Sequence, residues 1–196
     1  MKKQLVALTM TLTSFTSFTA GPVDRIGVKG PLTFNKTTFD LTWSDKPNAT
    51  YSIQEYLPQG ETAERFNQML TLHLFAQDTP LKSAVNQKLQ ELETRKQTDP
   101  TCNYQVTEGP GGKEFIVDFL LGVNTTEVST IVEFNIYRYK QVDLGKQKQG
   151  IVIYAYTKRA YGDQVTPFLK NLRQDRPALL NKMITAPIPT LKPAAK

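Results

Sequence analysis

The chain carries few side chains that perform chemistry by themselves. Its 196 residues include one histidine, His73, and one cysteine, Cys102. These two side chains cannot complete a closed zinc site, and no Gly-x-Ser-x-Gly segment presents a nucleophilic serine. The neighbours of Cys102, Thr101 and Asn103, add no positive charge that would lower its thiol pKa. We therefore predict no catalytic residue, no metal site and no cofactor. His73 is expected to be a core or boundary imidazole with one hydrogen bond, and Cys102 an inert thiol.

Residues suited to recognition lie in two segments with the two-residue repeat of β-strands. Within residues 131–139, alternation places Glu133, Asn135 and Tyr137 on one face and Arg138 on the other. Tyrosine combines an apolar ring with a hydroxyl group, which suits a recognition surface. The predicted ligand-binding residues are Glu133, Asn135, Tyr137, Arg138, Tyr154 and Arg159. The alternative is a structural role, in which the tyrosines pack under helices and pair across strands.

This aromatic and polar surface, without a nucleophile–base pair, predicts a non-enzymatic binding or accessory protein. Its partner is an unknown protein or small molecule. Two alternatives stay open. The first is a hydrolase or transferase built from carboxylates, such as Glu133 with Asp118 or Asp163. The second is an inhibitor or assembly factor that acts through the polar loop 143–149.

The N-terminus predicts export. Lys2 and Lys3 precede an uncharged, moderately apolar run over residues 5–18, and Ala20 follows as a small residue at the exit. The run covers about 21 Å as a helix, which is shorter than a hydrocarbon core of roughly 30 Å. We therefore predict a removed signal peptide over residues 1–20 and a periplasmic or secreted product.

Composition excludes several classes of partner. The net charge of +6 becomes +4 once Lys2 and Lys3 are removed, and the remaining lysines are scattered. Nucleic-acid binders carry a clustered basic stripe, so no nucleic-acid partner is expected. No later segment has eighteen consecutive apolar residues, which predicts no membrane span. The single cysteine excludes a disulfide within the chain.

The elements that must position these residues follow from periodicity and turn residues. Strands are expected over 38–43, 51–57, 115–121, 128–140 and 151–157. The first of two central helices should start near Thr62, because Phe66, Met69, Leu70 and His73 are spaced by three and four residues. The second should begin after Pro80, and a C-terminal helix near Thr166.

These elements predict one α+β domain over residues 37–184. We expect a mainly antiparallel sheet with two central helices and a C-terminal helix packed on it. Residues 21–36 are expected to form an N-terminal lead-in, and the Pro- and Lys-rich residues 185–196 a disordered tail.

Three segments, residues 55–62, 132–139 and 158–163, together resemble a group of uncharacterised exported bacterial proteins. In that group a strand ending in Tyr-x-Pro-x-Gly precedes a helix that often carries Trp where this chain has Phe66. The resemblance covers roughly residues 50–180. The order of elements also resembles the Mog1/PsbP-like α/β/α sandwich. Neither resemblance implies an activity, because a fold does not fix a function.

Overall fold

A computed structural model describes residues 21–125, 128–145 and 148–192. The predicted signal peptide, residues 1–20, lies outside the described residues, as do the last four residues of the predicted tail. Neither of the two described α-helices combines the length and the apolar character that a bilayer crossing needs.

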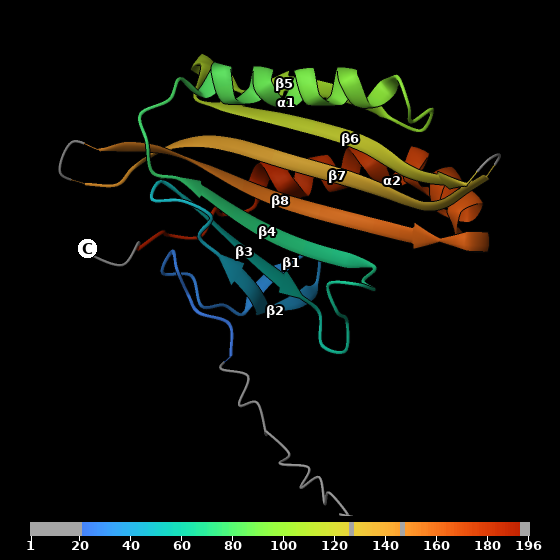
Figure 1. Ribbon diagram of the computed structural model, residues 1–196, viewed down its shortest axis with the longest axis horizontal. Coiled ribbons are helices and arrows are strands. Elements are labelled where there is room, and N and C mark those ends of the chain that lie inside the picture. Colours follow the sequence, from blue (N-terminus) through green and yellow to red (C-terminus); the bar gives the residue numbers. More distant parts are fainter. Residues whose placement is uncertain (1–20, 126–127, 146–147, 193–196) are drawn as a thin grey trace, which may run out of the picture.

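The described chain is built on one antiparallel sheet of eight strands in the order β1-β2-β3-β4-β8-β7-β6-β5 (Figure 1). The strands are β1 (Leu32–Phe34), β2 (Thr37–Asp45), β3 (Tyr51–Leu57), β4 (Gln68–Phe75), β5 (Asn103–Glu108), β6 (Glu114–Thr125), β7 (Val128–Asp143) and β8 (Gln149–Tyr161). The helices are α1 (Leu81–Lys96) and α2 (Val165–Thr185), with short 3-10 turns at Pro110–Gly112 and Gly162–Gln164.

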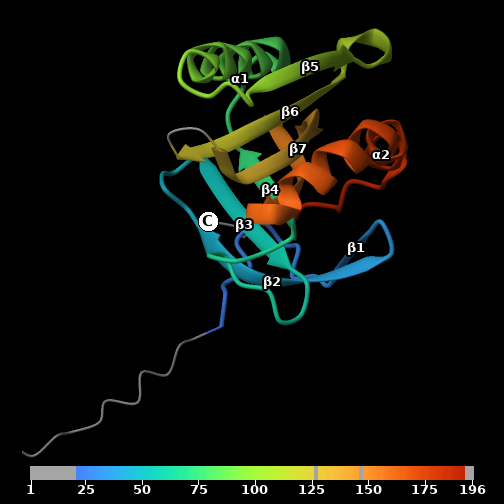
Figure 2. The same ribbon diagram turned by 90° about the vertical axis from the view of Figure 1, so that its right-hand side faces the viewer.

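The two helices lie on opposite faces of the sheet, as Figure 2 shows from the side. On one face, Leu172, Leu179 and Met183 of α2 pack against even-numbered residues of the long strands, such as Phe134. On the other face, Leu81, Val85 and Leu92 of α1 pack against odd-numbered residues. Each central strand is therefore apolar on both sides, because each side is covered.

The predicted fold class, a sheet with two central helices and a C-terminal helix, is wrong. The structure is mostly antiparallel sheet curved into half a barrel, with α1 and α2 as the two α-helices of the described residues. The first predicted central helix is instead a loop followed by β4. Leu70, Leu72 and Leu74 alternate along β4 and face the α2 core, while His73 lies on the other side. A strand buried on both faces reads as an almost continuous apolar run, which helical spacing also fits.

The ends of the described chain belong to the core. Ile26 is fully buried in the region predicted as a lead-in, and Phe34 in β1 packs near Tyr156. Ile188 and Leu191, in the region predicted as a tail, pack against the same cluster. The Lys192 amide donates to the carbonyl of Ile26 at 2.8 Å, which joins the two ends. The folded unit therefore extends at least from Ile26, before β1, to Lys192, beyond α2.

Candidate ligand-binding site

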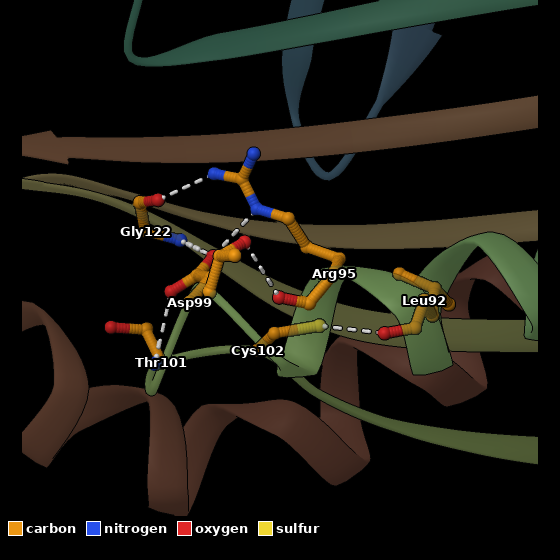
Figure 3. Close-up of polar contacts among 7 residues, drawn as sticks. Leu92, Arg95, Asp99, Thr101, Cys102 and Gly122 are labelled. Atoms are coloured by element: carbon orange, nitrogen blue, oxygen red, sulfur yellow. Dashed lines mark hydrogen bonds and ion pairs between the residues drawn. The ribbon is translucent and has the colours of Figure 1, made fainter.

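The C-terminal end of α1 is fixed to the sheet by a buried carboxylate. Asp99, only 2% exposed, accepts hydrogen bonds from the backbone N–H of Gly122 at 2.7 Å and from Thr101 at 3.0 Å (Figure 3). Arg95 of α1 donates to Asp99 at 3.1 Å and to the Gly122 carbonyl at 2.8 Å. A Cβ at Gly122 would lie 2.6 Å from Thr101 Oγ1, so this close approach of β6 requires glycine. The network holds one end of α1 at a set distance from the sheet.

Two hollows lie along the flank of α1 that faces the sheet. The first, of about 340 Å³, is lined by aromatic residues of the sheet, by His73 and by Lys88. The second, of about 520 Å³, is lined by Arg95, Leu121 and Glu133 among others. Glu91 of α1 lines both, and β7 contributes to the floor of both. We refer to the two together as the α1 groove, and to the first as the His73 hollow.

The aromatic lining of the His73 hollow comes from strands that are distant in sequence. Its rings belong to Tyr51 of β3, Phe75 of β4, and Tyr137 and Tyr139 of β7. The Tyr51 ring stacks on Phe75 with centroids 4.6 Å apart, and Tyr137 meets Phe119 edge-on at 5.0 Å. Packed in this way, the rings form a largely preformed apolar wall, which is the usual lining of a small-molecule site.

His73 is the polar group of this hollow with an unmet hydrogen-bonding capacity. Its Nδ1 lies 2.9 Å from the Tyr51 hydroxyl, and its buried Nε2 has no hydrogen-bond partner among the described residues. Burial, with a smaller effect from the nearby Lys88 charge, lowers the pKa of His73 to about 4. The imidazole is therefore neutral at pH 7, and Nε2 is a donor or an acceptor according to which ring nitrogen carries the proton.

The lowered pKa of His73 predicts a loss of stability in weak acid. A histidine in the unfolded chain takes up a proton below about pH 6.5, whereas folded His73 resists it until about pH 4. Below pH 6.5 the unfolded state therefore binds more protons, and the free energy of unfolding falls as the pH is lowered through this window. Between pH 7 and pH 4, the thermal midpoint should fall more steeply with decreasing pH in the wild type than in His73→Gln. Parallel curves would contradict a buried neutral imidazole.

A cation already lies beside the aromatic wall. The Lys88 ammonium is 4.9 Å from the centroid of the Phe119 ring and 5.4 Å from that of Tyr137. It also forms an ion pair of 2.8 Å with Glu91, and the Lys88 side chain is only 15% exposed. These rings therefore offer their negative faces to an ammonium group.

Four of the six predicted site residues lie on the face of the sheet that forms the groove. Glu133 lines the groove directly and pairs with Arg159, whose Nε donates to it at 2.6 Å. Tyr137 lines the His73 hollow. Asn135 lies between Glu133 and Tyr137 on the same face of β7, is 3% exposed, and takes a hydrogen bond from Thr157 at 2.7 Å. The strand alternation thus brings these four side chains to one surface.

The other two predicted site residues, Arg138 and Tyr154, lie on the opposite face. Tyr154 is buried under α2. Arg138 donates to the carbonyls of Met183 and Ala186 at 3.0 and 2.7 Å and pairs with Glu114. In the structure both side chains belong to the contact with α2 and do not reach the α1 groove.

Several groove residues were not predicted as part of a site. Tyr51 and Phe75 lie on strands that pair with β4 or belong to it, so the mistaken helix hid their proximity to Tyr137. Lys88 falls at helical spacing between Val85 and Leu92, and a lysine among apolar positions was a usable indication of an ionic or aromatic partner. Arg159, which was predicted as a site residue, has its guanidinium carbon 3.8 Å from the centroid of the Phe66 ring. This contact fixes the loop after β3 to β8.

Asp118, one carboxylate of the alternative hydrolase or transferase hypothesis, lies away from the α1 groove. Asp118 is on the α2 face and pairs with Arg176 at 2.7 Å, so it is separated from Glu133 by the sheet. The Cys102 sulfur contacts the Leu92 carbonyl at 3.6 Å, and burial raises the pKa of its thiol. The loop 143–149 lies partly outside the described residues. Within the described ranges, no three His, Cys, Asp or Glu side chains are grouped to hold a metal ion.

Comparison with known proteins identifies a family. One family model matches residues 26–188, a region that begins with the buried Ile26 and includes every strand and helix named above. No curated protein and no solved structure matches the chain. The chain therefore belongs to this family of uncharacterised proteins.

Proposed function

We propose that the protein is an exported, non-enzymatic binding protein that holds a small molecule in the His73 hollow. The observation that carries this proposal is the unpartnered Nε2 of a neutral His73 at an aromatic wall. Buried polar atoms are nearly always hydrogen-bonded, so an orphaned one beside a hollow points to a ligand contact. The ligand would have a flat apolar body and one group that hydrogen-bonds to the imidazole.

The size and chemistry of the hollow support a small ligand. Its volume of about 340 Å³ lies at the lower end of the range for ligand pockets, roughly 300–1,000 Å³. Few convergent polar groups beside an apolar wall are typical of reversible binding, whereas a reaction needs a nucleophile or paired acid and base. Within the described residues, His73 has no carboxylate partner that would make it a catalytic base.

Export and the resemblance to Mog1/PsbP-like sandwiches are parts of the same proposal. The basic start, the apolar run and Ala20 support export, and an N-terminus at Gly21 in protein recovered from the periplasm would test it. A helix on each face of one sheet supports the resemblance, which adds no activity of its own.

Blocking the hollow from α1 tests the proposed function. Gln87 is an exposed lining residue, and its neighbour Asn86 lies outside the lining. We expect N-phenyl-1-naphthylamine, a neutral aromatic probe with one N–H, to brighten on binding to the wild type. Gln87→Trp should weaken this binding by at least about tenfold, because an indole fills the hollow and removes apolar contact area. Asn86→Trp, the matched control, should bind like the wild type.

Fluorescence titration at 350 nm excitation measures both variants without interference from the added indole. Equal affinities in the wild type and both variants would place the probe elsewhere and contradict the proposal. No binding to the wild type would contradict it as well.

A further inference from the structure

The His73 hollow contains a mostly buried ammonium group whose acidic partner is exposed. Among the described residues that line the hollow, Lys88 and Glu91 are the two that carry a charge at pH 7. Their ion pair measures 2.8 Å, but the Lys88 side chain is 15% exposed and that of Glu91 66%. An exposed carboxylate three residues away on a helix contributes little, because water competes for it. Lys88 can therefore exchange this partner for an anion inside the hollow.

Lys88 has hydrogen-bonding capacity beyond this ion pair. An ammonium group has three N–H donors and no acceptor. Within the part of the chain that the structure describes, Glu91 is the one hydrogen-bond acceptor of Lys88. The rings of Phe119 and Tyr137 also lie beside the ammonium, but a ring face is a weaker acceptor for an N–H group than an oxygen atom. A ligand oxygen in the hollow would therefore gain a charge-assisted hydrogen bond.

Other polar groups without partners lie on the same wall of the hollow. The centroid of the Tyr137 ring is 5.4 Å from the Lys88 ammonium and 5.9 Å from the centroid of the His73 ring. The ammonium and the imidazole therefore adjoin the same ring, and Nε2 of His73 has no hydrogen-bond partner among the described residues. The hydroxyl groups of Tyr137 and Tyr139, which also line the hollow, form no hydrogen bond with any described residue.

These groups favour a ligand that accepts hydrogen bonds and carries a negative charge. Lys88 only donates, and each phenol supplies one O–H donor. Nε2 of His73 is also a donor when the Tyr51 hydroxyl donates to Nδ1 across their contact of 2.9 Å. The Lys88 charge is near enough to His73 to contribute to the lowering of its pKa, after burial. A second positive charge in the same hollow would therefore be repelled, whereas an anion would be attracted.

We infer that the ligand of the His73 hollow is a small organic acid, with its carboxylate beside Lys88 and its apolar body against the aromatic wall. An oxygen of the carboxylate, or a second acceptor on the same molecule, accepts a hydrogen bond from Nε2 of His73. This inference rests on the proposed function, because it names the ligand class of the same hollow. A neutral molecule of the same shape would leave Lys88 with its exposed partner only, which is why the negative charge should be selected.

Two competitors of the same shape separate charge from apolar contact. 2-Naphthoate carries a carboxylate, and 2-naphthamide carries a neutral carboxamide at the same position. Each is titrated at pH 7 against N-phenyl-1-naphthylamine bound to the protein. We expect 2-naphthoate to displace this probe from the wild type at a concentration at least about fivefold lower than 2-naphthamide. Lys88→Met should abolish the preference and still bind the probe. Lys82→Met, which removes the same charge at an exposed position of α1 outside the lining, should keep the preference.

Glu91→Gln should increase the affinity for the acid, an effect that a folding defect does not produce. The substitution removes the carboxylate that competes for Lys88, so 2-naphthoate should bind about threefold more tightly, with 2-naphthamide unchanged. Glu93→Gln is the matched control, because Glu93 is exposed on α1 and lies outside the lining. It should change the affinity for neither competitor.

The outcomes distinguish the organic-acid inference from the proposed function. If N-phenyl-1-naphthylamine does not bind the wild type, both are wrong. If it binds and the two competitors displace it equally, or neither displaces it, the inference is wrong while the hollow remains a binding site. A preference that survives in Lys88→Met, or a 2-naphthoate affinity that does not rise in Glu91→Gln, would also overturn the inference. If Lys88→Met does not fold, the wild type and Glu91→Gln decide the result.

Discussion

Asp99→Asn is expected to lower the free energy of unfolding by about 3 kcal/mol and the thermal midpoint by roughly 9 °C. The Asp99 carboxylate accepts from two backbone N–H groups and from Arg95. An asparagine of the same shape presents an NH₂ group to at least one of these donors. A buried donor that loses its acceptor has no water to replace it, so the cost exceeds that of an ordinary hydrogen bond.

The pH dependence of this stability loss tests whether the lost carboxylate hydrogen bonds cause it. Burial alone would raise the pKa of Asp99, but hydrogen bonds from Gly122, Arg95 and Thr101 hold it below its ordinary value. The stabilisation is therefore present above the pKa of the unfolded carboxyl and is lost as the pH falls through the lower folded value. The difference between wild type and Asp99→Asn should shrink in strong acid. Asp78→Asn, at an exposed position, should melt like the wild type at every pH. A small, pH-independent effect at Asp99 would contradict this account.

Arg138→Met is expected to destabilise the protein by about 2–3 kcal/mol and to leave probe binding in the groove unchanged. The methionine retains much of the apolar stem, whereas the carbonyls of Met183 and Ala186 lose a charged donor at the end of α2. Glu114 would keep its ion pair with Lys140 only. Denaturant unfolding followed by circular dichroism measures the loss.

Arg173→Met is the matched control, because Arg173 lies on the exposed side of α2. It should change stability by less than about 0.5 kcal/mol. If Arg138→Met unfolds like the wild type and loses probe binding instead, Arg138 belongs to the ligand site. That outcome would support the ligand-binding role that was predicted for Arg138 from the sequence.

Elements whose apolar residues have one clear spacing match the prediction. Residues 81–96 form a helix as expected, because their apolar spacing has one buried side and a proline at the start. The strand β3 has the predicted bounds of residues 51–57, since it alternates and ends at turn residues. Residues 68–75 were mistaken because Phe66, Met69, Leu70 and His73 are also spaced by three and four residues, and this helical spacing concealed the leucines at every second position.

The sequence by itself determined the local periods, the scarcity of reactive side chains, and the shared face of Glu133, Asn135 and Tyr137. These follow from single elements, in which side-chain direction depends only on the spacing along the chain. The tertiary structure decided which face α1 or α2 would cover, and therefore that Arg138 is buried under α2 while Tyr137 lines a hollow. It also decided that His73 and Lys88 meet around that tyrosine, because strand order and helix packing depend on contacts between residues far apart in sequence.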